Sequence, residues 1–97
     1  MLKITILDGE AERRLLVEGK LAEPWVSELE LAWDQARQAG RSSGIVVDLS
    51  GMTSIDPRGE AALIAMIADG ARLTARGLYR EYLVEELMKR ARKARAR

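Results

Sequence analysis

The residue types that can carry out chemistry are few in this 97-residue chain. It contains no histidine and no cysteine. The first absence excludes a Ser-His-Asp triad, a histidine general base and histidine-ligated metals, and the second excludes thiol catalysis, thiolate metal sites and disulfides. No glycine-rich phosphate loop of either common spacing is present. Because only carboxylates, lysine, tyrosine and serine remain for catalysis, an enzyme would have few residues to use, and we do not predict one.

Two carboxylates have the best placement for binding a ligand. Asp48 and Asp56 lie near the predicted carboxyl end of an apolar strand, where ligands bind in open α/β sheets. A magnesium ion or a nucleotide would suit that position. Two isolated aspartates are a weak pattern, however, and Asp56 also has the place of a helix N-cap. We therefore expect no metal and no cofactor, and keep a ligand site at these two aspartates as an alternative.

The segment that must position these residues spans residues 44–70. Four of the five residues from 45 to 49 are apolar and mostly β-branched (Ile45, Val46, Val47 and Leu49), which is typical of a strand buried on both faces. The dipeptide Ser50-Gly51 is predicted to end this strand. A short loop then leads into a helix.

This helix has both a start signal and a stop signal. The carboxylate of Asp56 can accept the free backbone N–H groups of Arg58 or Gly59, and its charge suits the helix dipole. Pro57 occupies the first helical position, where a missing N–H has no cost. Gly70 is the expected C-terminal stop. The sequence thus predicts a helix that Asp56 caps.

The same segment resembles the core of a STAS domain, the module shared by bacterial anti-sigma factor antagonists and the cytoplasmic tails of sulphate transporters. The family pattern is a hydrophobic strand ending Asp-Leu-Ser-Gly, followed a few residues later by Ile-Asp-Ser-Ser-Gly at the start of a helix. Val46–Gly51 matches the first half, and Ile55-Asp56 and Gly59 match the second. The departure is Pro57-Arg58, which replaces the two serines.

In the family, the second of these serines is the phosphoacceptor of a partner-switching kinase, and Arg58 occupies its position here. Arginine cannot accept the phosphoryl group, so phosphorylation at the usual position is not expected. The resemblance implies a cytoplasmic, bacterial regulator of transcription whose partner is an anti-sigma factor or a serine kinase-like protein. A displaced phosphosite at Ser54 and a role as an accessory subunit of a transporter are alternatives.

In STAS domains this loop and the following helix form the docking surface for the partner. The resemblance therefore implies a partner-binding surface made of Ser54, Asp56, Pro57, Arg58, Glu60 and Ile64. Arg58 and the free N–H groups at the helix start have the chemistry to hold an anion or an acidic side chain of the partner. The alternative is that Asp56 and Pro57 serve only as the helix cap.

The run Ala61–Ala68 has no polar residue. A helix on one face of a sheet normally shows a polar stripe, so some of these side chains must face away from the core. We expect Ala62, Ile64 or Met66 to be outward and to form an interface, either with a foreign partner or in a homodimer. The alternatives are that the last helix covers the run or that only small alanines face outward.

The remaining elements follow from hydrophobic periodicity and from turn residues. Strands are expected at Leu2–Leu7, Arg14–Gly19 and Ala71–Ala75, and helices from Pro24 to Gly40 and from Tyr79 onward. The order β-β-α-β-α-β-α predicts one α/β domain over residues 1–97, a STAS-like mixed sheet of about four strands with helices packed on it. Trp25 and Trp33, eight residues apart on one helix face, are expected in its core.

Charge is distributed unevenly along the chain. Residues 89–97 carry six positive charges and no negative ones, whereas the other 88 residues carry ten positive and fifteen negative charges. This basic tail has a functional interpretation as a contact for nucleic acid or an anionic membrane. It lacks interleaved aromatic residues, and basic residues also suit the C-terminus of a helix. We therefore favour a solvated helix end and regard nucleic-acid binding as an alternative. No signal peptide or membrane-spanning run is apparent.

Overall fold

The computed structural model describes residues 1–38 and 44–95 and confirms the predicted order of elements. These elements are β1 (Leu2–Asp8), β2 (Arg13–Leu21), α1 (Val26–Gln38), β3 (Ile45–Ile55), α2 (Pro57–Ala68), β4 (Arg72–Thr74) and α3 (Leu78–Arg95). The predicted C-terminus of the first helix at Gly40 and the last basic residue, Arg97, lie outside the described residues.

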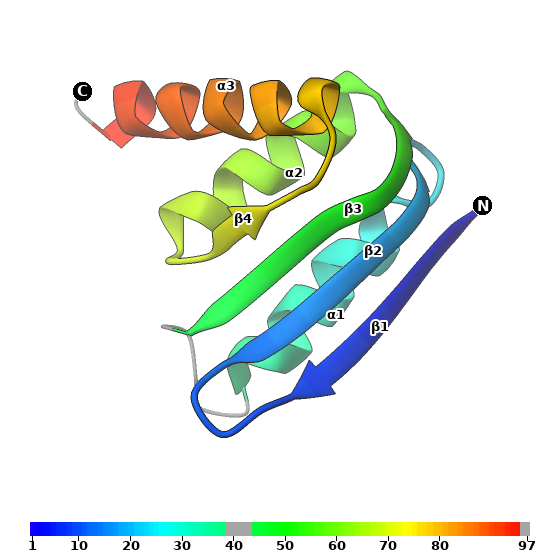
Figure 1. Cartoon of the computed structure of the whole chain (residues 1–97), viewed down its shortest axis with the longest axis vertical. Helices are drawn as coiled ribbons and strands as arrows, with labels where there is room; N and C mark the ends of the chain where they lie inside the picture. The colour runs from blue at the N-terminus through cyan, green and yellow to red at the C-terminus, as the bar shows by residue number, and fades with distance from the viewer. Residues whose placement is uncertain (39–43, 96–97) are drawn as a thin grey trace.

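The four strands form one mixed sheet in the order β1-β2-β3-β4. β1 and β2 form the expected antiparallel hairpin, in which Asp8 is paired with Arg13. β2, β3 and β4 run parallel to one another, because α1 and α2 carry the chain back along the sheet between them. Figure 1 shows the three helices and the twisted sheet that they cover. The predicted mixed sheet is confirmed.

One hydrophobic core joins the sheet to the helices. Alternate residues of the two central strands are buried in it, together with the apolar faces of α1, α2 and α3. The fully buried strand residues are Leu15, Val17, Leu21, Ile45, Val47 and Leu49. Trp33 is only 4% exposed, and Trp25 is partly buried against the same cluster. The predicted core position is therefore confirmed for Trp33, whereas Trp25 lies before α1 and only at the edge of the core.

The predicted end of the central strand at Ser50-Gly51 is wrong, because β3 continues to Ile55. The pairing of β2 with β3 shifts register twice, and these irregularities accommodate the extra residues of β3. Gly51 stays in the ladder opposite Glu18, where a Cβ would lie 2.7 Å from the Glu18 Cγ. Here glycine permits a close approach between strands, whereas the sequence pattern suggested a strand end.

Two helix predictions also need correction. α1 begins at Val26 and not at Pro24, because Pro24 lies in a turn in which the Trp25 N–H donates to the Ala22 carbonyl at 2.9 Å. The last helix, predicted from Tyr79 onward, begins one residue earlier, at Leu78, and Tyr79 is 66% exposed.

A tight contact between backbones fixes where α2 meets β2. Gly59 is buried in the first turn of α2, and a Cβ there would lie 2.3 Å from the Leu21 carbonyl oxygen and 2.9 Å from the Ile55 Cγ1. The first of these neighbours is a main-chain atom that cannot rotate away. Any larger residue at this position must therefore push α2 away from the sheet.

We expect Gly59→Ala to lower the free energy of unfolding by about 3 kcal/mol, at the upper end of the cost of overpacking. Urea denaturation followed by tryptophan fluorescence measures this loss. Ala65→Gly, at an exposed position of the same helix, is the control and should cost about 1 kcal/mol through helix propensity alone. A loss for Gly59→Ala no larger than that of the control would show that the contact does not constrain the helix.

Candidate partner-binding surface

Asp56 joins three separate segments of the chain. Its Oδ1 accepts a hydrogen bond from the Gly59 backbone N–H at 2.8 Å, which confirms the predicted N-cap of α2. Its Oδ2 accepts from the Glu23 backbone N–H at 2.9 Å, in the turn between β2 and α1. Its own N–H donates to the Leu21 carbonyl at 3.2 Å. The start of α2 is therefore tied both to the end of β2 and to the turn before α1.

These hydrogen bonds favour the charged form of the carboxylate. The backbone N–H of Glu23 is the largest cause, followed by that of Gly59, and together they lower the pKa of Asp56 below its ordinary value of 3.8. Asp56 is therefore ionised at neutral pH, next to the N-terminus of α2, where a negative charge is favourable.

Arg58 is held by two carboxylates of its own chain. Its Nε lies 3.1 Å from the Glu23 Oε1, and its Nη2 lies 3.4 Å from the Glu30 Oε1. A positive side chain in the first turn of a helix opposes the helix dipole, and these two acidic side chains offset that cost. The guanidinium remains half-exposed. It is therefore accessible to a partner while being oriented by α1 and the turn before it.

The other predicted surface residues follow the same segment of the chain. Ser54 and Pro57 are exposed on either side of Asp56. Glu60 is partly buried, and its Oε1 lies 3.0 Å from the Arg90 Nη1 of α3. Ile64 is partly buried against the core. The exposed part of the predicted surface is thus concentrated at the end of β3 and the first turn of α2.

The apolar run of α2 exposes much less apolar surface than its composition suggested. α2 packs against both α1 and α3 (Figure 1), and Ala62 and Met66 are buried. The prediction that either of them faces outward is wrong. The exposed residues of the run are Ala61, Ala65 and Ala68. The alternative that α3 covers the run and that small alanines face outward is therefore correct.

The two aspartates of the alternative ligand site do not come together. Asp48 lies in the first half of β3, and Asp56 follows its last residue. Eight residues of extended chain separate two positions by about 26 Å. Within residues 1–38 and 44–95, no group of three or more acidic side chains could hold a metal ion. A shared ligand site at Asp48 and Asp56 is therefore ruled out.

Asp48 instead belongs to an ion-pair network on the sheet, which the sequence did not reveal. Its Oδ2 accepts from the Arg14 Nη1 at 3.1 Å, and its Oδ1 accepts from the Ser50 backbone N–H at 2.9 Å. The Glu12 Oε2 lies 3.0 Å from the Arg14 Nη2, and the Glu12 Oε1 lies 3.0 Å from the Arg72 Nη2. The network therefore reaches from β2 to β4. Burial raises the pKa of Asp48, but the hydrogen bonds from Ser50 and Arg14 outweigh it and lower the pKa overall.

Sequence reasoning also missed Glu23 and Glu30 as partners of Arg58. They lie 35 and 28 residues before it in the chain, and no local spacing links them. The basic segment from Lys89 continues α3 as far as Arg95, which agrees with the favoured interpretation as a helix end. No helix in the described part of the chain is long and apolar enough to cross a membrane.

Protonation of Asp56 should weaken the fold at acid pH. Because its pKa is lower in the folded state, its contribution to stability is fully present above the ordinary value of 3.8 and is lost as the pH falls through the lower folded-state value. We expect Asp56→Asn to be less stable than the wild type at pH 7, with a difference that shrinks below pH 3.8. Urea denaturation between pH 7 and pH 2.5 measures it. A difference that does not change with pH would contradict this assignment.

Comparisons with known proteins agree with this architecture. No protein-family model matches the sequence, and no curated protein matches it. Among solved structures, an anti-sigma factor antagonist from Mycobacterium paratuberculosis superposes with a TM-score of 0.76 at 21% identity, over 92% of this chain and 81% of that one.

Two further solved structures are similar. One is a protein of the DUF3478 family with a SpoIIAA-like fold from Shewanella loihica PV-4, with a TM-score of 0.56 at 10% identity, over 84% of this chain and 72% of that one. The other is Mglu, with a TM-score of 0.52 at 19% identity, over 75% of this chain and 19% of that one. At these identities the likeness establishes the fold, and this chain has the SpoIIAA-like fold of anti-sigma factor antagonists that the resemblance to STAS domains implied.

Proposed function

We propose that this protein is a non-enzymatic binding module that acts like an anti-sigma factor antagonist, with its docking surface at the end of β3 and the first turns of α2. The observation that carries the proposal is the fold shared with such an antagonist over 92% of this chain. Its partner is an anti-sigma factor or a serine kinase-like protein of the bacterial cytoplasm. By occupying that partner, it would influence which sigma factor is free for transcription.

The geometry of the surface supports this role. The docking segment does not need to become ordered on binding, because the Asp56 carboxylate accepts one hydrogen bond from the Glu23 N–H in the neighbouring turn and one from the Gly59 N–H in the first turn of α2. A preorganised surface loses little conformational entropy when it binds. Ser54, Pro57 and the half-exposed Arg58 stand on this fixed backbone, and arginine is among the residue types that contribute most to protein interfaces.

The proposal includes a difference in regulation from the usual pattern of the family. At the position of the phosphoacceptor, Arg58 has no hydroxyl group, and its positive charge is matched by Glu23 and Glu30. A binding surface that cannot gain a phosphate there cannot be switched off there. The module is therefore permanently competent to bind, unless Ser54, which is exposed beside the site, is modified instead.

Co-purification from the native cell tests the docking surface. Wild type and Arg58→Glu are compared, and bound proteins are identified by mass spectrometry. The substitution places a third carboxylate beside Glu23 and Glu30, so we expect it to weaken capture of the partner at least about tenfold. Arg76→Glu, an exposed arginine before α3, should capture as well as wild type.

Circular dichroism must first show that each variant is folded. Equal capture by wild type and Arg58→Glu would contradict the location of the surface. If only transporter subunits were recovered, the role of an accessory subunit of a transporter would be favoured over the antagonist function. If only nucleic acid were recovered, in a salt-dependent manner, nucleic-acid binding would be favoured instead.

Phosphorylation tests the proposed regulation separately. The captured kinase and ATP are incubated with wild type, Arg58→Ser and Ser54→Ala, and the phosphate is mapped by mass spectrometry. We expect no phosphate on the wild type and a new phosphate in Arg58→Ser, because that variant supplies the missing hydroxyl at the same backbone position. Phosphate on Ser54 of the wild type, absent from Ser54→Ala, would show that the acceptor has been displaced.

A further inference from the structure

β1 is a long, open edge of the sheet. It stands at the end of the strand order and pairs along one side only, with β2, from Leu2 opposite Gly19 to Asp8 opposite Arg13. Figure 1 shows that no other described element flanks its outer side. Its seven residues contain no proline, and their pairing with β2 shows no bulge. Such an edge presents free backbone N–H and C=O groups that can pair with another strand.

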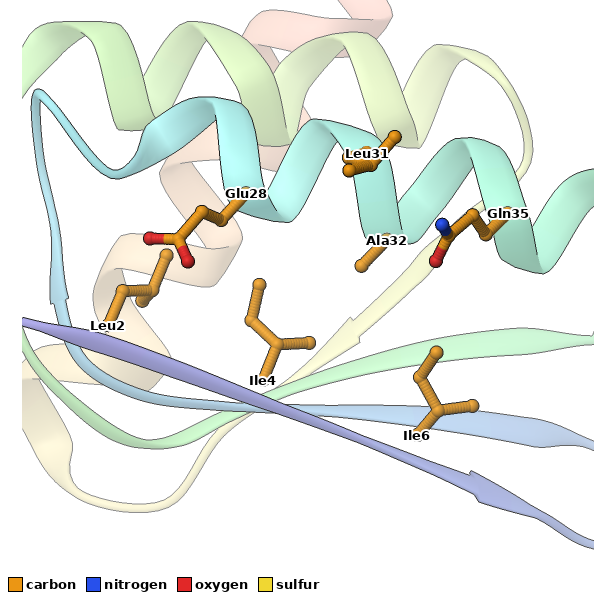
Figure 2. A pocket seen from close by; sticks show the side chains of 7 residues that line it. All are labelled: Leu2, Ile4, Ile6, Glu28, Leu31, Ala32 and Gln35. Atoms are coloured by element: carbon orange, nitrogen blue, oxygen red, sulfur yellow. The ribbon is translucent and has the colours of Figure 1, made fainter.

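An apolar groove runs along this edge. It lies between β1 and α1, has a volume of about 290 Å³, and is lined by Leu2, Ile4, Ile6, Glu28, Leu31, Ala32 and Gln35. In Figure 2 the three side chains of β1 point toward α1. Two of the apolar residues are substantially exposed, Leu31 at 59% and Ile6 at 43%. Exposed apolar side chains beside an unpaired strand edge mark an interaction surface.

We propose that this edge and groove bind a second copy of the chain, through antiparallel pairing of β1 with the β1 strand of the partner across a two-fold axis at Ile4. In this register Leu2 lies opposite the partner's Ile6. This register keeps Leu2, Ile4 and Ile6 of both copies on the same face of the joined sheet. Shifting one β1 strand by one residue relative to the other would place the groove residues of the two copies on opposite faces. The two sheets would then join into one continuous sheet.

The lining of the groove favours a second copy over other occupants. Along α1 it has an apolar centre, Leu31 and Ala32, with one polar residue at each end. The two-fold axis at Ile4 runs the two α1 helices antiparallel, so that the Glu28 carboxylate lies toward the end at which the partner's Gln35 amide can donate to it, and no like charges of the groove lining meet. A surface that is complementary to itself in this way is what a two-fold dimer requires.

The opposite edge of the sheet is a poorer partner for β1. β4 has only three residues, so pairing β1 with the partner's β4 would engage less than half of the seven-residue edge. That contact would also be head-to-tail and would not close into a dimer. The β1 edge lies away from α2 and α3 (Figure 1), so the proposed dimer leaves the surface around Arg58 free on both copies.

Analytical ultracentrifugation of the full chain tests the dimer. We expect a concentration-dependent dimer for wild type and an increase of at least about tenfold in its dissociation constant for Leu31→Lys and for Ile6→Lys, because each buries an unpaired charge in the interface. Leu78→Lys, at a residue of α3 that is 91% exposed, is the matched control and should dimerise as wild type does. A monomeric wild type at millimolar concentration would overturn the proposal, as would a dimer that neither groove variant weakens.

Cross-linking tests the register, because a disulfide forms across the interface only where two thiols face each other. The chain has no cysteine, so Ile4→Cys introduces one thiol on the proposed axis, where it should form a disulfide with its counterpart under mild oxidation. Thr5→Cys lies opposite the partner's Lys3 and should cross-link less, and Leu78→Cys should give only the background rate. Equal cross-linking of all three variants, or occupation of the groove by a different protein without self-association, would overturn the proposal.

Discussion

Asp56 is the point at which the strands, the turn before α1 and the start of α2 are held in one arrangement. Its carboxylate accepts two backbone N–H groups that are 36 residues apart in the chain, those of Glu23 and Gly59. The cap can form only if α2 begins close to β2, and this closeness leaves room for glycine alone at position 59. The position of the helix, the shape of the exposed segment and the orientation of Arg58 all depend on this junction.

Exposed ion pairs then connect the helices to one another. Arg58 links the start of α2 to α1 through Glu30, Arg37 of α1 pairs with Asp69 after α2, and Arg90 of α3 pairs with Glu60. Each pair contributes little to stability, because both charges are partly hydrated. Their effect is on geometry and on charge, since they hold the arginine and carboxylate side chains of the surface in place and neutralise them. The positive charge of Arg58 is therefore largely neutralised by Glu23 and Glu30 of its own chain.

The sheet separates two kinds of surface. At the carboxyl end of β3, the exposed side chains stand on a backbone fixed by hydrogen bonds, which suits a specific partner. At β1, the backbone itself is unpaired, and apolar side chains from α1 and β1 lie beside it. Between them, the network of Asp48, Arg14, Glu12 and Arg72 crosses the central strands. This network gives Asp48 a structural role, which separates it from the site predicted with Asp56.

The sequence by itself determined the order of the elements, the N-cap at Asp56 and the burial of Trp33, because strand alternation, helical periodicity and capping depend on residues within a few positions of each other. Its resemblance to STAS domains also predicted the topology. Only the tertiary structure decided that β3 continues beyond Gly51, that Met66 faces the core and that Arg58 is paired with carboxylates of α1 and the preceding turn. Each of these outcomes depends on which distant segment lies alongside, and no local pattern specifies that neighbour.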